Sequence, residues 1–221
     1  MDRRNFFKYS FSKLTEAGVG ALEHRAEQKA RNWIRPPFAK HELDFLLECT
    51  RCNACMEACP SQVIFLLPVS RGPEVAATPA LDLLNKGCQL CNNWPCVTAC
   101  EAGALAFPPE PTTTLVEQDD PASSENDPAL KPKPEPEPEQ GTLAIPAPQE
   151  CPPLAKVTIN TEYCIPYAGP ECGACRGSCP IPETLLWQGE KPVINEETCV
   201  GCGLCREMCI TAPKAINICS S

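Results

Sequence analysis

The chain has 221 residues, of which 18 are cysteines and only 6% are aromatic, and its formal net charge is −9. This acidity argues against a nucleic-acid-binding protein, and since no run of 18 apolar residues occurs, we expect no transmembrane segment. With few aromatic side chains for so many cysteines, we expect small cores that depend on disulfides or metal centres as well as on packing.

Residues 1–35 form an N-terminal arm, and the abundance of Ala, Glu, Lys, Gln and Arg predicts a helix from Ser10 to Trp33. The opening MDRRNFFK looks like a twin-arginine export signal, but such a signal continues with an uncharged apolar region. Here that region is charged, so we expect a cytoplasmic protein, with twin-arginine export to the periplasm as the alternative. The charged residues are Lys13, Glu16, Glu23 and Arg25.

Residues 36–107 form the first cysteine-rich unit. We expect a short helix from His41 to Glu48, directly before the first cysteine group, and a strand from Val63 to Leu67. Residues 61–87 separate two cysteine groups and are more than a minimal ferredoxin-like unit needs.

Residues 108–153 are predicted to be a linker. They contain 13 of the 26 prolines, ten acidic residues and two lysines, and residues 131–139 read KPKPEPEPE. Proline at every second position excludes helix and sheet and favours an extended chain, and high charge with low hydrophobicity favours disorder. We interpret the segment as a spacer, with a recognition segment for a partner as the alternative.

Residues 154–221 form the second cysteine-rich unit. Lys156 to Ile159 and Ala215 to Ile218 read as short strands that flank the cysteine groups, and we expect them to pair antiparallel and close the unit. Thr184 to Trp187 and Pro192 to Ile194 read as a β-hairpin. The chain is therefore an internal duplication of two units with two cysteine groups each.

Sixteen of the cysteines fall into four tight groups. The group beginning at Cys49 has the spacing C-x2-C-x2-C-x3-C-P, which is the run that binds iron–sulfur clusters in bacterial ferredoxins. Two other groups vary this spacing. The second has a longer loop before its third cysteine, Cys96, and the third has a longer loop after its first cysteine, Cys164. The group beginning at Cys199 repeats the first spacing without the proline.

The geometry of this run predicts crossed ligation. The first three sulfurs leave one tight loop and reach one cluster, whereas the fourth lies past the loop and reaches the other cluster of its unit. We therefore expect four [4Fe–4S] clusters with four sets of ligands. Set 1 is Cys49, Cys52, Cys55 and Cys100; set 2 is Cys88, Cys91, Cys96 and Cys59; set 3 is Cys164, Cys172, Cys175 and Cys209; set 4 is Cys199, Cys202, Cys205 and Cys179.

Two other uses of the cysteines are disfavoured. Structural zinc takes two ligand pairs with a longer spacer between them. The groups here instead have cysteines at a spacing of three residues, followed by a fourth cysteine. Disulfides suit a secreted scaffold of dispersed cysteines rather than tight groups. Cys151 and Cys219 are left over, and we assign them no role as ligands.

The sequence contains no catalytic constellation: it has two histidines outside any ligand spacing, and no Gly-rich nucleotide loop or nucleophile elbow. We therefore expect an electron carrier and not an enzyme.

The cysteine groups, together with the residues between their cysteines, resemble those of the polyferredoxins of the NapF, NapG and MauM types. These polyferredoxins are linked to periplasmic nitrate reductase and methylamine utilisation. The resemblance rests on Cys164 to Pro180, Cys199 to Cys205, Trp33 to Phe38 and Cys49 to Cys59. It implies four [4Fe–4S] clusters and electron transfer to or from redox proteins, among them a molybdoenzyme or a membrane-bound quinol-linked complex. Alternatives are an iron–sulfur subunit of a larger oxidoreductase and a maturation factor for a molybdoenzyme.

The sequence thus predicts an α+β protein in which two bacterial-type bi-cluster ferredoxin-like domains are joined by a disordered Pro/Glu-rich linker. Single electrons would pass between cubane clusters, with potentials set by thiolate ligation, hydrogen bonds and solvent exposure.

Overall fold

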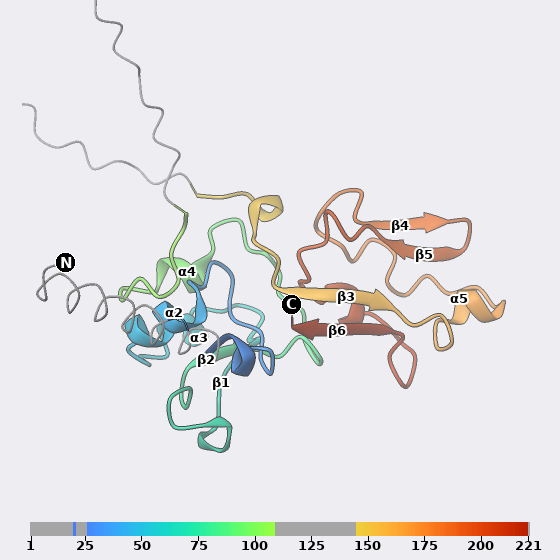
Figure 1. Ribbon diagram of the computed structural model, residues 1–221. Helices are drawn as coiled ribbons and strands as arrows, with labels where there is room; N and C mark the ends of the chain where they lie inside the picture. Colours follow the sequence, from blue (N-terminus) through green and yellow to red (C-terminus); the bar gives the residue numbers. More distant parts are fainter. Residues whose placement is uncertain (1–19, 21–25, 109–144, 221) are drawn as a thin grey trace, which may run out of the picture. The chain divides into compact units, whose positions relative to one another are not determined.

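The computed structural model describes residue 20, residues 26–108 and residues 145–220 (Figure 1). We call residues 26–107 the first half and residues 145–220 the second half; both belong to one compact unit. Of the predicted N-terminal helix, residues 26–30 are helical, whereas the export-like start and the KPKPEPEPE segment lie outside the described residues. No helix in the described ranges is long and apolar enough to cross a membrane.

The first half combines short helices with one small antiparallel sheet. The predicted helix before the first cysteine group and the predicted strand after it are both confirmed. The partner strand and a 3-10 turn, which were not predicted, occupy the long spacer between the cysteine groups. The elements are α2 (Glu42–Glu48), α3 (Ala54–Glu57), β1 (Ile64–Leu66), η1 (Val69–Arg71), β2 (Pro79–Leu81) and α4 (Pro95–Thr98).

Arg35 fixes the segment that leads into α2. Its guanidinium donates to both carboxylate oxygens of Glu42, at 2.9 and 2.5 Å, and lies 4.5 Å from the ring centroid of Phe45. It also donates to Thr78 and to the carbonyl of Pro79 on β2. Since a bidentate arginine can satisfy a buried carboxylate, one side chain joins the lead-in, α2 and β2.

Aromatic side chains form much of the apolar core of the first half. Phe45 and Trp94 are almost fully buried. Phe38 makes edge-to-face contacts with Trp94, at 4.9 Å between ring centroids, and with Phe107, at 5.2 Å. Such contacts are favourable because the positive edge of one ring meets the negative face of the other.

The second half is built from two two-stranded antiparallel sheets and single-turn helices (Figure 1). The predicted hairpin is confirmed, with Gln188 opposite Lys191 at its turn. Gly189 supplies a φ of 63° there, which costs other residues strain. The elements are η2 (Pro148–Glu150), β3 (Ala155–Ile159), α5 (Ile165–Ala168), β4 (Leu185–Gln188), β5 (Lys191–Ile194), α6 (Leu204–Glu207) and β6 (Ile216–Ser220).

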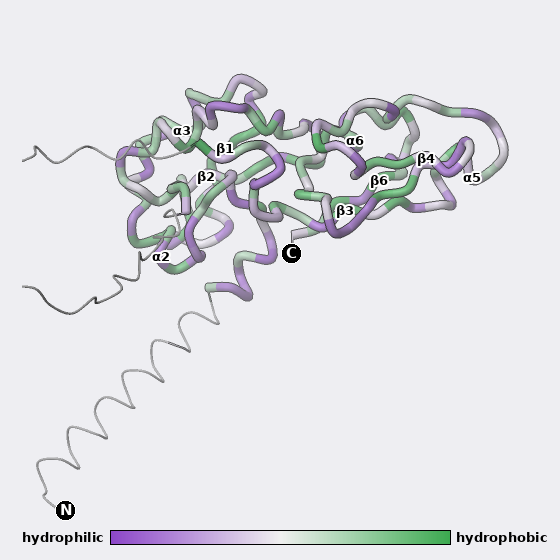
Figure 2. The backbone as a smooth tube through the Cα atoms, turned by 90° about the horizontal axis from the view of Figure 1, so that it is seen from above, coloured by the Kyte–Doolittle hydropathy of each residue, from purple (hydrophilic) through white to green (hydrophobic). Residues whose placement is uncertain are grey.

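The ends of each half are joined by antiparallel backbone pairing. In the second half, β3 and β6 pair over five residues with Val157 opposite Ile218, as predicted. Apolar and polar residues alternate along the first four positions of β3 (Figure 2). The apolar ones are buried and the polar ones exposed, as expected for a sheet with one buried face. In the first half the equivalent pairing is a single bridge between Ala39 and Leu105.

Residues 145–153, the end of the segment assigned to the linker, pack against the protein. The indole of Trp94 donates to the carbonyl of Pro146 at 2.6 Å, and Cys151 is 4% exposed within the main apolar cluster. The only regular element among residues 145–153 is the 3-10 turn η2, and the prolines do not prevent docking through a carbonyl oxygen and an apolar side chain.

Candidate iron–sulfur centres

Three of the four cysteine groups share one local conformation. A residue in the left-handed region precedes a single-turn helix, and the third cysteine of the group lies in that helix. The left-handed residues are Asn53, Trp94 and Gly203, with φ of 67°, 41° and 81°. Glycine and asparagine adopt this conformation most readily. The sharp turn brings the earlier cysteines of a group round to the side of the third.

In the first half the thiols gather in crossed sets. Cys55 interacts electrostatically with Cys100 from the other group, as well as with Cys49 and Cys52 of its own. Cys96 likewise interacts with Cys59 and Cys55 from the first group. Each fourth cysteine of this half therefore lies near the third cysteine of the other group, and the two sets adjoin each other.

In the second half the crossed sets also line two cavities. All four thiols of set 4 line one apolar cavity, together with Val157, Ile181 and Ile194. All four thiols of set 3 line another, together with Trp187 and Ile216. Each cavity of this half thus combines three thiols of one cysteine group with the fourth thiol of the other.

Burial and neighbouring thiolates oppose ionisation of these thiols in the absence of a metal. Burial, with a contribution from Cys100 and Cys49, raises the pKa of Cys55 to about 11. Burial raises the pKa of Cys96, Cys202 and Cys205 to about 12, and adjacent thiols add to the shift. Several thiolates crowded in an apolar site are stable only with a compensating cation, so the electrostatics fit a site for iron.

Two of the fourth cysteines accept hydrogen bonds that offset this cost. Burial acts against ionisation of Cys59, but the hydroxyl of Ser61, at 3.4 Å, and the amides of Val63 and Ile64 lower its pKa overall. For Cys209 the effect of burial is likewise outweighed, by the hydroxyl of Thr211, at 3.3 Å, and by backbone amides, so that its pKa is also lowered overall. The sequence reasoning missed these hydroxyls, although Ser or Thr two positions after a fourth cysteine is a readable signal.

The arrangement does not suit one ion per set. In the described halves, no group of three or more His, Cys, Asp or Glu side chains converges tightly enough to hold a single metal ion. Tetrahedral zinc needs all four sulfurs about 2.3 Å from one point, whereas in a cubane each thiolate binds a different iron. Sets of thiols that interact around a cavity without converging on a point fit the cubane.

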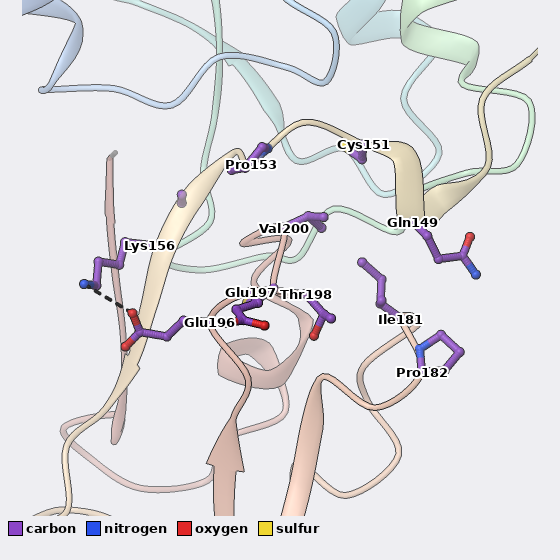
Figure 3. A pocket seen from close by; sticks show the side chains of 12 residues that line it. Gln149, Cys151, Pro153, Lys156, Ile181, Pro182, Glu196, Glu197, Thr198 and Val200 are labelled. Atoms are coloured by element: carbon purple, nitrogen blue, oxygen red, sulfur yellow. Dashed lines mark ion pairs between the residues drawn. The ribbon is translucent and has the colours of Figure 1, made fainter.

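The two remaining cysteines differ from each other. Cys219 lies on β6 and is exposed. Cys151 is buried beside sets 2 and 4, and it lines a surface pocket with Cys199 and Val200 (Figure 3). On the far side of this pocket Lys156 forms an ion pair with Glu196. Burial raises the pKa of Cys151, with further contributions from Cys88 and Cys202, so its thiol stays neutral.

Comparison with known proteins agrees with this geometry. A 4Fe-4S dicluster domain matches residues 48–104, and a 4Fe-4S binding domain matches residues 192–212. The chain thus contains sequences of the 4Fe-4S ferredoxin type in both halves. It is 26% identical to the methylamine utilization ferredoxin-type protein MauM of Methylobacillus flagellatus, over 98% of this chain and 83% of MauM. It is 26% identical to the ferredoxin-type protein NapG of Haemophilus influenzae, over 98% of this chain and 71% of NapG.

The ferredoxin-type protein NapF of Escherichia coli is also 26% identical, over 82% of this chain and 83% of NapF. The resemblance to the MauM, NapG and NapF types is therefore confirmed over most of the chain, and with it the assignment to iron–sulfur electron-transfer proteins. No solved structure matches the chain.

Proposed function

We propose that this ferredoxin-type protein is an electron carrier with four [4Fe–4S] clusters, held by sets 1 to 4. The observation that supports the proposal is the crossed gathering of thiols in both halves, with one cavity lined by all four thiols of set 4 and another lined by all four thiols of set 3. When bound, such clusters supply one-electron redox couples. The chain contributes the thiolates, donates hydrogen bonds to them and excludes water with apolar walls.

Iron and acid-labile sulfide on anaerobically purified protein test the cluster number. Four cubanes require about 16 irons and about 16 sulfides per chain, with zinc measured in parallel. About two to four zincs without sulfide would overturn the proposal, and about eight irons would leave only one half loaded.

Exchange of a fourth cysteine tests the crossed ligands. The proposal expects Cys59→Ser to perturb the centre that also depends on Cys88, so that the double variant with Cys88→Ser changes the EPR spectrum no further than the single ones. A double variant of Cys59 and Cys52, which belong to different sets, should perturb two centres. The opposite pattern would mean that each group closes on its own cluster.

We propose that the partners are larger redox enzymes, which exchange single electrons with this chain. MauM is by name a protein of methylamine utilization, and the crossed thiol sets give this chain a means of electron exchange. Co-purification with a stable partner would identify a subunit of an oxidoreductase. A cluster-free variant that still binds its client would instead identify a maturation factor.

A further inference from the structure

The second and fourth cysteine groups meet at a backbone hydrogen bond. The amide of Cys88 donates to the carbonyl of Cys202 at 2.7 Å. Cys88 belongs to set 2 in the first half and Cys202 to set 4 in the second half, so residues assigned to two different clusters are in direct contact.

The chain is shaped for this contact at Gly87. A Cβ atom at this position would lie 2.8 Å from the Cα atom of Leu204, which no side chain tolerates. Two further hydrogen bonds hold the same segments together. The amide of Gly87 donates to Glu207 at 2.9 Å, and Arg206 Nε donates to the carbonyl of Leu84 at 3.0 Å.

Apolar groups surround the contact. Cys151 is buried and interacts with Cys88 and Cys96 on one side and with Cys202 on the other. Leu83 and Val200 belong to the same buried cluster. Cys88 and Cys202 are themselves buried, so water is excluded from the side of the contact where they meet. Electron exchange between two centres falls steeply with the distance between them.

We propose that the contact of Gly87 and Cys88 with the segment from Cys202 to Glu207 is the electron-transfer junction between the two halves. This inference rests on the proposed function. With both centres bound, sets 2 and 4 would hold the donor and the acceptor of a single electron, one centre being oxidised as the other is reduced. No bond or proton changes, so no further reactant is needed. The four centres then form one path, in the order of sets 1, 2, 4 and 3.

The test is low-temperature EPR on the full chain reduced with dithionite. Gly87→Val forces the contact apart, and Gly173→Val is its matched control, since Gly173 also adjoins a cysteine of a set but has nothing within 4 Å of a Cβ. Coupling between the centres of sets 3 and 4 does not involve position 87 and serves as an internal reference. The wild-type spectrum minus that of Gly87→Val contains the interaction across the junction, and we expect this component to be lost in Gly87→Val and kept in Gly173→Val.

Glu207→Ala provides a second variant that changes neither a cysteine nor a glycine, with Glu57→Ala at the same place in α3 as its control. If Gly87→Val loses iron, the comparison of Glu207→Ala with Glu57→Ala decides the outcome. Wild-type protein with four clusters, but with no difference from either variant, would overturn the junction and leave the proposed function intact. Wild-type protein without iron and sulfide would overturn both.

A second inference comes from the three tryptophans. The indole N–H of Trp33 donates to Glu42 at 3.3 Å, and that of Trp94 donates to Pro146 at 2.6 Å. The Nε1 of Trp187 is buried without an acceptor among the described residues. Trp187 lines the cavity of set 3, and its ring lies 4.3 Å from the guanidinium carbon of Arg176.

A buried N–H without an acceptor is rare in proteins and calls for an explanation. The geometry points to Trp187 as a positioning residue whose indole N–H donates to a sulfur atom of the centre held by set 3. Since a hydrogen bond to a cluster sulfur stabilises the more negative, reduced state, the indole raises the potential of that centre.

Redox titration followed by EPR tests this role. Trp187→Phe keeps an aromatic ring but removes the N–H, and we expect one of the four centres to shift to lower potential with unchanged iron content. Trp33→Phe, whose N–H has a protein acceptor, is the control and should shift none. If Trp187→Phe shifted none of the four potentials, or shifted all four equally, the assignment would be wrong.

Discussion

The two halves hold the same kind of thiol sets with different means of support. The first half closes its ends with one β-bridge, between Ala39 and Leu105, and relies on an aromatic core and on Arg35. The second half closes its ends with the five-residue ladder of β3 and β6 and has a core of aliphatic residues. The cysteine groups thus require only that the two ends of each half lie side by side. Either side-chain packing or backbone pairing achieves this.

The spacer between cysteine groups shows the same freedom. In the first half it forms β1, η1 and β2, whereas in the second it forms a tight hairpin with Gly189 at the turn. Both spacers lie between the groups and contribute no cysteine. Their length is therefore free to change without altering the thiol sets.

Removal of iron is the largest perturbation that we predict. Small domains without a staple bury too little apolar surface to be stable, and loss of the centres should unfold much of both halves. Because the first half also has its aromatic core, we expect it to retain more protection. Hydrogen exchange by mass spectrometry after anaerobic chelation measures this, with residues 42–48 compared with residues 155–159. Greater protection of residues 155–159 would mean that the ladder is the stronger support.

Truncation of the aromatic core should come next. Trp94 is 1% exposed and contacts Phe38, so Trp94→Ala should cost about 3–5 kcal/mol of unfolding free energy. Leu186 in the second half is 43% exposed, and Leu186→Ala should stay within about 0.5 kcal/mol. Thermal unfolding of the loaded proteins gives the comparison. Equal melting temperatures for the two variants would refute the importance assigned to the aromatic core.

Breaking an ion pair should likewise cost more stability in the first half than in the second. Arg35→Ala leaves the buried carboxylate of Glu42 without its main partner, which typically costs about 3–5 kcal/mol. Lys156 and Glu196 are largely exposed, and breaking such a pair costs at most about 1 kcal/mol. Denaturant titration of Arg35→Ala and Lys156→Ala distinguishes them. A larger loss for Lys156→Ala would reverse the comparison.

Local patterns were readable from the sequence, but contacts between distant segments were not. The helix before Cys49, the hairpin of β4 and β5 and the pairing of β3 with β6 each follow from periodicity or turn residues. The crossed sets follow from cysteine spacing and remain a prediction about ligands. The contact at Gly87 could not be read, because an isolated glycine does not tell which backbone approaches it. The acceptor at Pro146 was equally hidden, since its segment reads as linker.

The smallest effect that we predict concerns hydroxyls beside the thiol sets. In the first half Ser61 contacts Cys59 of set 2, and in the second half Thr211 contacts Cys209 of set 3. Cys100 and Cys179 are followed two positions later by Ala102 and Ile181, which have no hydroxyl. The hydroxyls therefore distinguish sets 2 and 3 from sets 1 and 4 within their halves.

A hydroxyl that donates to a ligand thiolate stabilises the reduced state, so its removal should lower the potential of that centre. We expect Ser61→Ala and Thr211→Val each to shift one centre by roughly 20–60 mV, since 59 mV is a tenfold change in a one-electron equilibrium. Thr98→Val is the control, because the Thr98 hydroxyl bonds to backbone carbonyls. If Ser61→Ala and Thr211→Val shift the same centre in a redox titration, the two hydroxyls cannot serve different sets, and the crossed assignment of Cys59 and Cys209 fails with them.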